Sequence, residues 1–398
     1  MTDGQSGFFE VAMQQQDRQP QTVMLVAGEA SGDAHAAAMF LQLKKRLPGI
    51  RGIGMGGQKM ARAGIDVRFD SSQIGVIGVI EVLKHYREIR AALRQMQKLV
   101  ADERPDLLIC VDYKEFNFKL ARHARRCGVK VLFYVSPQVW AWRPGRAKKY
   151  GRVIDMMAVI FPFETPYYQE HDIPVRYVGH PSVDKVVPQR SRSEDRRLFA
   201  LPKESPVVGI LPGSRSQEIR RMLPVMLQAA DDVQKAFPGC RFLLPQADSI
   251  SDELLQAMLQ DSSVAVQVIR NQPYDVIQCC DAVMITSGTA TLETALLTVP
   301  MVIVYKLSTL TYLLGRWLVK SPFIGLPNIV AGKAIVRELI QHQARAETLA
   351  GEIKKILADP DYAAKMRREL GKVRQLLGPG GGDRAMAELA EEMLRQAD

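Results

Sequence analysis

The chain has 398 residues, of which 47% are hydrophobic and 24% are charged. This composition excludes a disordered or fibrous protein, and the length predicts two domains. The net charge of +10 indicates an anionic partner, without choosing among nucleic acid, phosphorylated substrates and acidic lipid. The five cysteines are odd in number and lack metal-binding spacing, which predicts a reducing, cytoplasmic location.

The chain begins with a polar stretch at 1–20, for which we expect a disordered tail and no signal peptide. From Gln21 onward, short β-branched runs alternate with amphipathic helical patterns. This alternation is typical of a parallel sheet covered by helices on both faces, and it predicts a first domain over 21–187. Its strands are expected at 22–27, 107–112, 130–135, 156–161 and 175–178.

A charged stretch without apolar periodicity, 188–205, predicts a linker. A second domain is then expected over 206–345, followed by purely helical residues at 346–398 that could pack on the first domain or exchange between the subunits of a homodimer. The fold class predicted is α/β, with two doubly wound Rossmann-like domains and a cleft between them. Strands of the second domain are expected at 207–211, 241–244, 264–269, 282–285 and 301–305.

Two glycine-rich stretches of the first domain resemble phosphate loops only in part. The turn at 27–33 opens a helix after the first strand, but it lacks the Gly-Lys-Ser/Thr end of an ATP-binding loop. The glycines of 52–57 match a dinucleotide pattern, but they do not follow the opening strand. We therefore expect a flexible turn at 52–57.

Ligands of parallel sheets bind beyond the carboxyl ends of the strands. Asp112 lies at the carboxyl end of one strand and is suited to be a general base, although a helix-capping role is equally compatible with its position. Trp140 and Trp142 stand beside Arg143 and a run of cations that ends at Arg152. This combination suits a phosphate-bearing ligand or a lipid–water boundary, and a solvated basic helix is the alternative.

The second domain carries two loops with phosphate-binding chemistry. Arg215 follows a strand, where its guanidinium can clamp a diphosphate. At 286–289, small residues open a helix whose amino end favours an anion, and Glu293 lies one turn in, where it can accept hydrogen bonds from a ribose. An ordinary strand–turn–helix is the alternative for this second loop. A third loop, at 326–328, can add an amide donor.

Five stretches, taken together and in this order, resemble the lipid-A-disaccharide synthase family of two-domain glycosyltransferases. They are 26–33 (VAGEASGD), 134–143 (YVSPQVWAWR), 211–215 (LPGSR), 287–293 (SGTATLE) and 325–328 (GLPN). The resemblance implies a GT-B fold and transfer of diacylglucosamine from UDP to diacylglucosamine 1-phosphate, with inversion. The products would be a β(1→6)-linked lipid A disaccharide 1-phosphate and UDP, as in lipopolysaccharide biosynthesis.

The resemblance also assigns site residues. It implies Asp112 as the catalytic base, with Glu29 as the alternative. UDP would be bound by Arg215, Ser287, Gly288, Thr289, Glu293 and Asn328. The acceptor or membrane side would carry Ser31, Asn117, Trp140, Trp142 and Arg143. Lys114 and Glu115 depart from the proline and aspartate that the family usually carries after the aspartate.

The absence of an Asp-x-Asp motif near the UDP loops predicts that neither a metal nor a cofactor is required. Because the implied substrates are acylated, we expect a peripheral protein on the cytosolic face of the inner membrane, bound to anionic lipid through the apolar stretch 74–83 and the basic segment.

Three other functions compete with this interpretation. A UDP-sugar epimerase of the same fold would not need the tryptophan segment. A nicotinamide dehydrogenase would need a glycine fingerprint after the first strand, and a nucleic-acid-binding protein would need a recognisable motif, which the sequence lacks.

Overall fold

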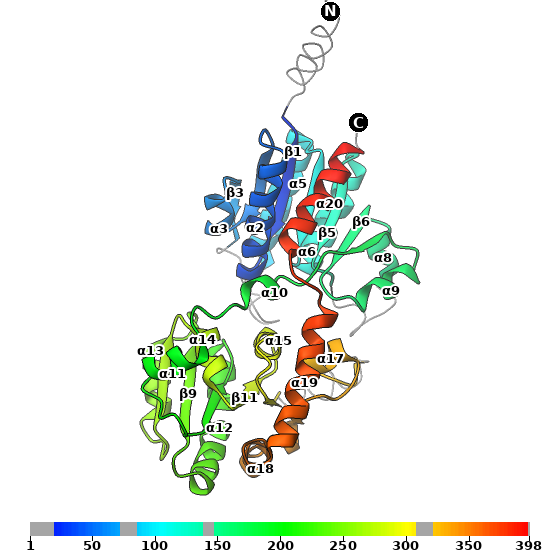
Figure 1. Ribbon diagram of the computed structural model, residues 1–398. Coiled ribbons are helices and arrows are strands. Elements are labelled where there is room, and N and C mark those ends of the chain that lie inside the picture. The colour runs from blue at the N-terminus through cyan, green and yellow to red at the C-terminus, as the bar shows by residue number, and fades with distance from the viewer. Residues whose placement is uncertain (1–19, 72–85, 138–146, 308–320, 397–398) are drawn as a thin grey trace, which may run out of the picture. The chain divides into compact units, whose positions relative to one another are not determined.

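The computed structural model describes residues 20–71, 86–137, 147–307 and 321–396, which fall into two compact units. The first unit comprises 1–181 and 381–398, and the second comprises 182–380 (Figure 1). Each unit is a parallel sheet with helices on both faces, which confirms the predicted pair of Rossmann-like domains. The expected tail at 1–20 lies, except for Pro20, outside the described residues.

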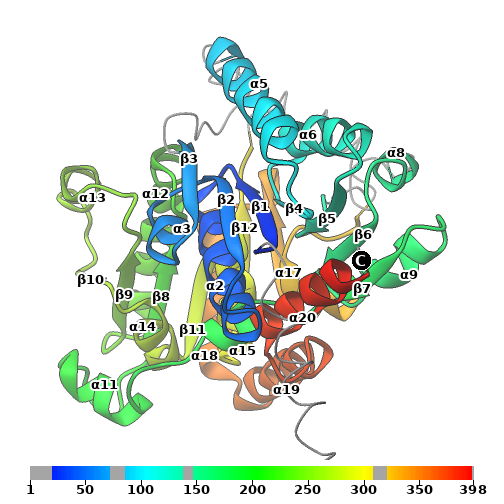
Figure 2. The same ribbon diagram turned by 90° about the horizontal axis from the view of Figure 1, so that it is seen from above.

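The first unit contains a seven-stranded sheet in the order β3-β2-β1-β4-β5-β6-β7. Helices α2 (Ala30–Arg46) and α20 (Gly382–Arg395) cover one face, and α5 (Tyr86–Glu103) and α6 (Lys114–Arg126) cover the other (Figure 2). The strands are β1 (Thr22–Ala27), β2 (Arg51–Gly56), β3 (Asp66–Asp70), β4 (Leu107–Val111), β5 (Lys130–Tyr134), β6 (Met156–Val159) and β7 (Val175–Tyr177). Because β1 and β4 are covered on both faces, every residue in them is buried.

The prediction of a flexible turn at 52–57 is wrong, because β2 is a buried strand there. Its glycines serve close packing. A Cβ atom on Gly52 would lie 2.6 Å from the Phe40 ring, and one on Gly54, whose φ is +148°, would lie 1.9 Å from the Leu25 carbonyl oxygen. Tertiary packing therefore overrides the low β-propensity of glycine.

The second unit contains a six-stranded parallel sheet in the order β10-β9-β8-β11-β12-β13. Its strands are β8 (Val207–Leu211), β9 (Arg241–Gln246), β10 (Val266–Arg270), β11 (Ala282–Thr286), β12 (Met301–Tyr305) and β13 (Arg337–Ile340), the last of which the sequence did not predict. Its helices include α12 (Ser216–Ala236), α14 (Pro273–Cys279), α15 (Thr289–Leu296), α17 (Leu326–Ala331), α18 (Ala346–Ala358) and α19 (Pro360–Leu376).

The expected linker at 188–205 is folded into the second unit. It contains α11 (Arg192–Leu198), which begins with a capping box formed by Ser191 and Glu194. The fully buried Asp195 accepts hydrogen bonds from Arg190 and from Gln278 of α14, both at 2.5 Å. The charged residues Arg190 and Asp195 of this stretch therefore pair with each other inside the second unit. The boundary between the two units lies at 181, ahead of the expected linker.

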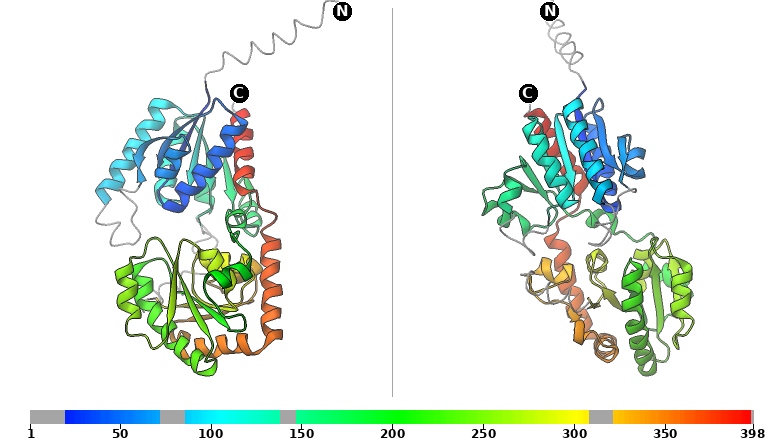
Figure 3. Two further views of the ribbon diagram at one scale, coloured as in Figure 1. Left: turned by 60° about the vertical axis from the view of Figure 1, so that its left-hand side comes forward. Right: turned by 180° about the vertical axis from the view of Figure 1, so that it is seen from behind.

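The C-terminal helices divide between the two units, where the sequence predicted one helical segment. Helices α18 and α19 pack in the second unit, whereas α20 (red) lies alongside α2 (blue) in the first (Figure 3). An ion pair joins Arg46 of α2 to Glu391 of α20 at 2.5 Å, and Lys130 donates to the Met393 carbonyl at 3.3 Å. In this chain, therefore, the last helix packs on the first domain, which is one of the two predicted arrangements.

None of the helices within the described ranges combines the length and the apolar character needed to cross a membrane. The apolar stretch 74–83 lies outside the described residues.

Candidate functional site

The order in which strands are added to the second sheet reverses between β8 and β11. The chain passes from β8 to β9 and β10 on one side, and β11, β12 and β13 follow on the other. Because β8 and β11 are parallel neighbours, with Leu211 opposite Ile285, the loops that follow them share one edge of the sheet, as the sequence predicted. A switch in strand order of this kind is where doubly wound sheets bind ligands.

The loop after β8 presents Arg215 at the start of α12. The two carboxylate oxygens of Glu218 accept from the Ser214 backbone N–H at 3.2 Å and from Arg215 Nη1 at 3.1 Å. Gly213, at φ +115°, lies so close to Glu218 that a Cβ there would meet the carboxylate at 2.5 Å. The Arg215 side chain is 57% exposed, so its guanidinium is oriented by Glu218 while remaining accessible to a ligand.

The loop after β11 ends at the first turn of α15. Ser287 Oγ donates to the Ile324 carbonyl at 2.8 Å, whereas Gly288 and Thr289 are exposed. The side chain of Glu293 lies one turn further, with its carboxylate 3.5 Å from the Tyr274 hydroxyl. Burial raises the pKa of Glu293, and the tyrosine hydroxyl opposes that rise. The exposed amino end of α15 can receive an anion, with a carboxylate acceptor beside it.

The Asn328 side chain is fully buried, where the sequence predicted a donor for a ligand. Its Nδ2 donates to the Val336 carbonyl at 2.9 Å and to Glu338 at 2.8 Å, and its Oδ1 accepts from the Ile335 and Val336 N–H groups. Glu338 also accepts from the N–H groups of Ile324 and Gly325. Asn328 therefore fixes the loop whose Ile324 carbonyl binds Ser287.

Two further residues at this edge were not predicted. Arg221 of α12 donates to the Lys306 carbonyl at 3.3 Å. Tyr305 ends β12, and burial raises its pKa; the charge of Glu218 adds to the rise, and those of Arg215 and Arg221 oppose it. Arg221 follows Glu218 by three residues, so the two lie on one face of the helix. This spacing can be read from the sequence and could have identified Arg221.

The first sheet has its own switch in strand order, between β1 and β4, where Ala27 lies opposite Val111. Glu29 follows β1 and Asp112 follows β4, so the two predicted carboxylates lie at one edge. Asp112 and Tyr113 both adopt left-handed conformations, at φ +47° and +46°. Consecutive left-handed residues without glycine are costly, and they cluster at functional sites.

Asn117 holds this edge together. It is fully buried, and its Nδ2 donates to the Asp112 carbonyl at 2.8 Å and to the carbonyls of Val26 and Val111 at 3.3 Å. These contacts tie the ends of β1 and β4 to the start of α6. The predicted acceptor-side residue Asn117 is thus a structural neighbour of Asp112, with its side chain directed into the protein.

The carboxyl group of Asp112 lies largely inside the protein. Burial raises its pKa, and the charge of Lys114 and a hydrogen bond from the Tyr113 backbone oppose that rise. Helix α6 begins at Lys114 with Tyr113 as its N-cap residue, so Asp112 does not occupy the capping position that was the alternative. A carboxylate with a raised pKa is suited to take up a proton.

Glu29 is exposed and precedes α2. Burial raises the pKa of Tyr113, and the charge of Glu29 adds to this rise. Ser31 is exposed in the first turn of α2. Asp33, which was not predicted, accepts from the N–H groups of Gly57, Lys59 and Met60 and so caps α3 (Gln58–Arg62). This part of the glycine-rich motif is structural.

Trp140, Trp142 and Arg143 lie outside the described residues. Across the described ranges, no group of three or more His, Cys, Asp or Glu side chains is arranged to hold a metal ion.

Comparison with known proteins adds the family context. A family model described as lipid-A-disaccharide synthetase matches residues 23–392. The lipid-A-disaccharide synthase of Trichlorobacter lovleyi is 45% identical over 378 residues, which cover 95% of this chain and 99% of that protein. The enzyme of the same name from Geobacter metallireducens is 47% identical over 372 residues, which cover 94% of this chain and 97% of that protein. Among solved structures, a UDP-GlcNAc 2-epimerase from Neisseria meningitidis bound to UDP-GlcNAc superposes with a TM-score of 0.61 at 13% identity, covering 94% of this chain and all of that chain.

Proposed function

Because the chain belongs to the lipid-A-disaccharide synthase family and is a glycosyltransferase, we propose that it joins UDP-2,3-diacylglucosamine to 2,3-diacylglucosamine 1-phosphate. The products are the β(1→6)-linked lipid A disaccharide 1-phosphate and UDP. The observation that carries the donor half of this proposal is the pair of loops after β8 and β11, which bring Arg215 and the amino end of α15 to one edge of the second sheet.

UDP binds at that edge. Arg215 clamps the diphosphate, Ser287, Gly288 and Thr289 surround it at the start of α15, and Glu293 accepts from the ribose hydroxyls. Asn328 acts through the loop that it holds against Ser287. Arg221, whose charge acts on Tyr305 as that of Arg215 does, adds a second positive charge that favours the diphosphate as it leaves.

Asp112 is the catalytic base. The acceptor hydroxyl oxygen attacks the anomeric carbon, the bond from that carbon to the diphosphate breaks, and UDP leaves with the electron pair. The hydroxyl proton passes to Asp112, whose raised pKa suits this transfer. One displacement inverts the anomeric centre. Glu29, at the same edge of the sheet, is the alternative base.

We propose that the protein works on the cytosolic face of the inner membrane, where acylated sugars reside, and that anionic lipid holds it there. The outer sides of three neighbouring helices are basic. They carry exposed Arg87, Arg90, Arg94 and Lys98 on α5, Lys119, Arg122 and Arg126 on α6, and Lys148 and Lys149 on α8 (Ala147–Gly151). Contacts between α5 and α6, and the packing of Phe118 against Tyr150, join these helices into one layer. Ser31, Trp140, Trp142 and Arg143 belong to the acceptor or membrane side in this proposal.

A mass-spectrometric product assay tests the reaction. Purified protein is incubated with UDP-diacylglucosamine alone, with diacylglucosamine 1-phosphate alone, and with both. We expect the disaccharide phosphate and UDP only when both sugars are present. The chain shares its fold with an epimerase that is 13% identical in sequence. An epimerase would change the donor sugar in the absence of the acceptor, and that result would refute the proposal.

A further inference from the structure

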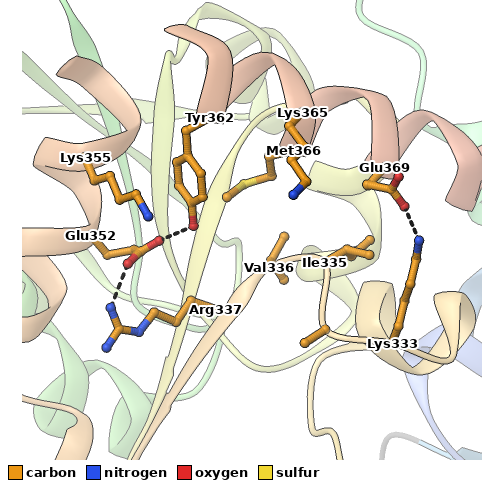
Figure 4. A pocket seen from close by; sticks show the side chains of 11 residues that line it. Lys333, Ile335, Val336, Arg337, Glu352, Lys355, Tyr362, Lys365, Met366 and Glu369 are labelled. Atoms are coloured by element: carbon orange, nitrogen blue, oxygen red, sulfur yellow. Dashed lines mark hydrogen bonds and ion pairs between the residues drawn. The ribbon is translucent and has the colours of Figure 1, made fainter. Parts of the chain in front are cut away.

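A cavity of about 580 Å³ lies in the second unit, and neither Arg215 nor the start of α15 lines it (Figure 4). It is bounded by the segment from Lys333 to Arg337, which leads into β13, and by α18 and α19. Because β13 runs parallel to β12, this segment lies at the amino edge of the sheet, whereas the UDP loops follow the carboxyl ends. The cavity is therefore at the opposite edge of the sheet from Arg215 and the start of α15, although Asn328 binds the backbone of its wall residues Ile335 and Val336. Its volume is in the range of small-molecule sites.

Both carboxylates that line the cavity are already neutralised. The side chain of Glu352 is only 4% exposed, and it accepts from Arg337 Nη1 at 2.7 Å and from the Tyr362 hydroxyl at 2.5 Å. Glu369 pairs with Lys333 at 2.6 Å and with Lys372 at 2.6 Å, and these ammonium groups lower its pKa to about 2. The cavity wall therefore presents little free negative charge to a ligand.

Two lysines supply positive charge beyond these pairs. The Lys355 ammonium lies 4.0 Å from the centroid of the Tyr362 ring, and Lys365 projects from α19 towards the cavity (Figure 4). Among the ion pairs formed by the described residues, neither lysine has a carboxylate partner. Four cations and two carboxylates line the cavity, so its net charge is positive.

The remaining wall is apolar. Ile335 and the Tyr362 ring are half-buried and keep part of their surface accessible beside the cavity, and the almost fully buried Val336 and Met366 lie behind them. We propose that this cavity is a second ligand site, which binds an organic phosphate through Lys355 and Lys365 and packs the organic part of that ligand against Ile335 and the Tyr362 ring. The two ammonium groups favour an anion such as phosphate in the cavity, and the apolar wall favours an ester over the inorganic ion.

Titration calorimetry of the full chain with phenyl phosphate tests this site. We expect binding by the wild type, and by an Arg215→Ala variant that weakens the proposed UDP loops. A Lys355→Gln/Lys365→Gln variant should bind at least about tenfold more weakly, since each charge-assisted contact is worth roughly a factor of ten. Inorganic phosphate should bind the wild type more weakly than phenyl phosphate does.

A Lys354→Gln/Arg368→Gln variant is the matched control, because it removes two cations from the same helices outside the cavity wall. It should bind phenyl phosphate as the wild type does. Four results would overturn the proposal: no binding by the wild type, loss of binding only in Arg215→Ala, equal weakening in the two double variants, or equal affinity for the two phosphates. Melting temperatures of all variants verify that the substituted surface residues leave the fold intact.

Discussion

At the start of α12, Glu218 orients the guanidinium of Arg215, which is proposed to bind the diphosphate. Arg215→Ala should therefore weaken UDP binding by about 1.5–3 kcal/mol, the usual worth of a hydrogen bond to a charged group. Calorimetric titration with UDP measures this loss. Arg220→Ala, an exposed cation on the same helix, is the control and should leave the affinity unchanged. Equal affinities in the Arg215 variant and the wild type would remove the diphosphate from this loop.

Glu293→Ala should weaken UDP binding by a different route, through the ribose. Uridine, which lacks the diphosphate, separates the two contacts. We expect Glu293→Ala to lose affinity for uridine and Arg215→Ala to keep it. A Glu293 variant that binds uridine like the wild type would contradict the ribose contact.

Asp112→Asn keeps the shape of the side chain and removes the proton acceptor. Turnover should fall by about 10²–10⁴, the range expected for loss of a general base, while UDP affinity is retained.

Because burial raises the pKa of Asp112, wild-type activity should be lost as the pH falls through a value above the ordinary range of an aspartate. Lys114→Met removes the charge that opposes this rise, and it should move the acidic limb of the pH–rate profile to higher pH. If Asp112→Asn remains active and Glu29→Gln does not, Glu29 is the base.

At this scale the structure bears on the predicted positions of the site residues. It predicted that Asp112 and Arg215 follow strands, and the structure bears this out. Asn117 and Asn328 were assigned to ligands, yet both are fully buried and hydrogen-bonded to backbone groups. Their partners include Val26 of β1 and Glu338 of β13, which lie on separate elements, so a pattern along the chain could not identify them.

At the scale of elements, apolar runs decided which strands could be predicted. Strand β1, with six buried residues, was predicted with its observed bounds. Strands β2, β3 and β13 were not, because β2 alternates with glycine and β3 and β13 lie at sheet edges with partly exposed, charged residues. Edge strands need less apolar surface, so composition marks them weakly.

Gly54→Ala tests why β2 contains glycine. The new Cβ would collide with the Leu25 carbonyl oxygen, so the free energy of unfolding should fall by roughly 1–3 kcal/mol or more. Urea denaturation measures this change. Gly371→Ala is the control, because Gly371 lies inside α19 with open space around it, and alanine there should be neutral or stabilising. Equal stability of the two variants would show that β2 can shift to accept a side chain.

At the scale of the molecule, α20 completes the first unit. It buries Met386, Leu389, Met393 and Leu394, each worth about 1.5–3 kcal/mol when removed from water. A chain ending at Gly380 should therefore lose the cooperative unfolding of the first unit while the second unit still binds UDP. Scanning calorimetry and UDP titration of the truncated protein distinguish the two effects. An unchanged thermogram would mean that α20 contributes little to the first unit.

The division of 381–398 from the rest of its unit has a consequence for the order of synthesis. On the ribosome, β1 to β7 emerge first, but the helix that covers α2 emerges only after the whole of 182–380. Domains of nascent chains usually fold in the order in which they emerge. Here the first unit is interrupted by the second, so its apolar surface beside α2 stays uncovered until the residues of α20 have been synthesised.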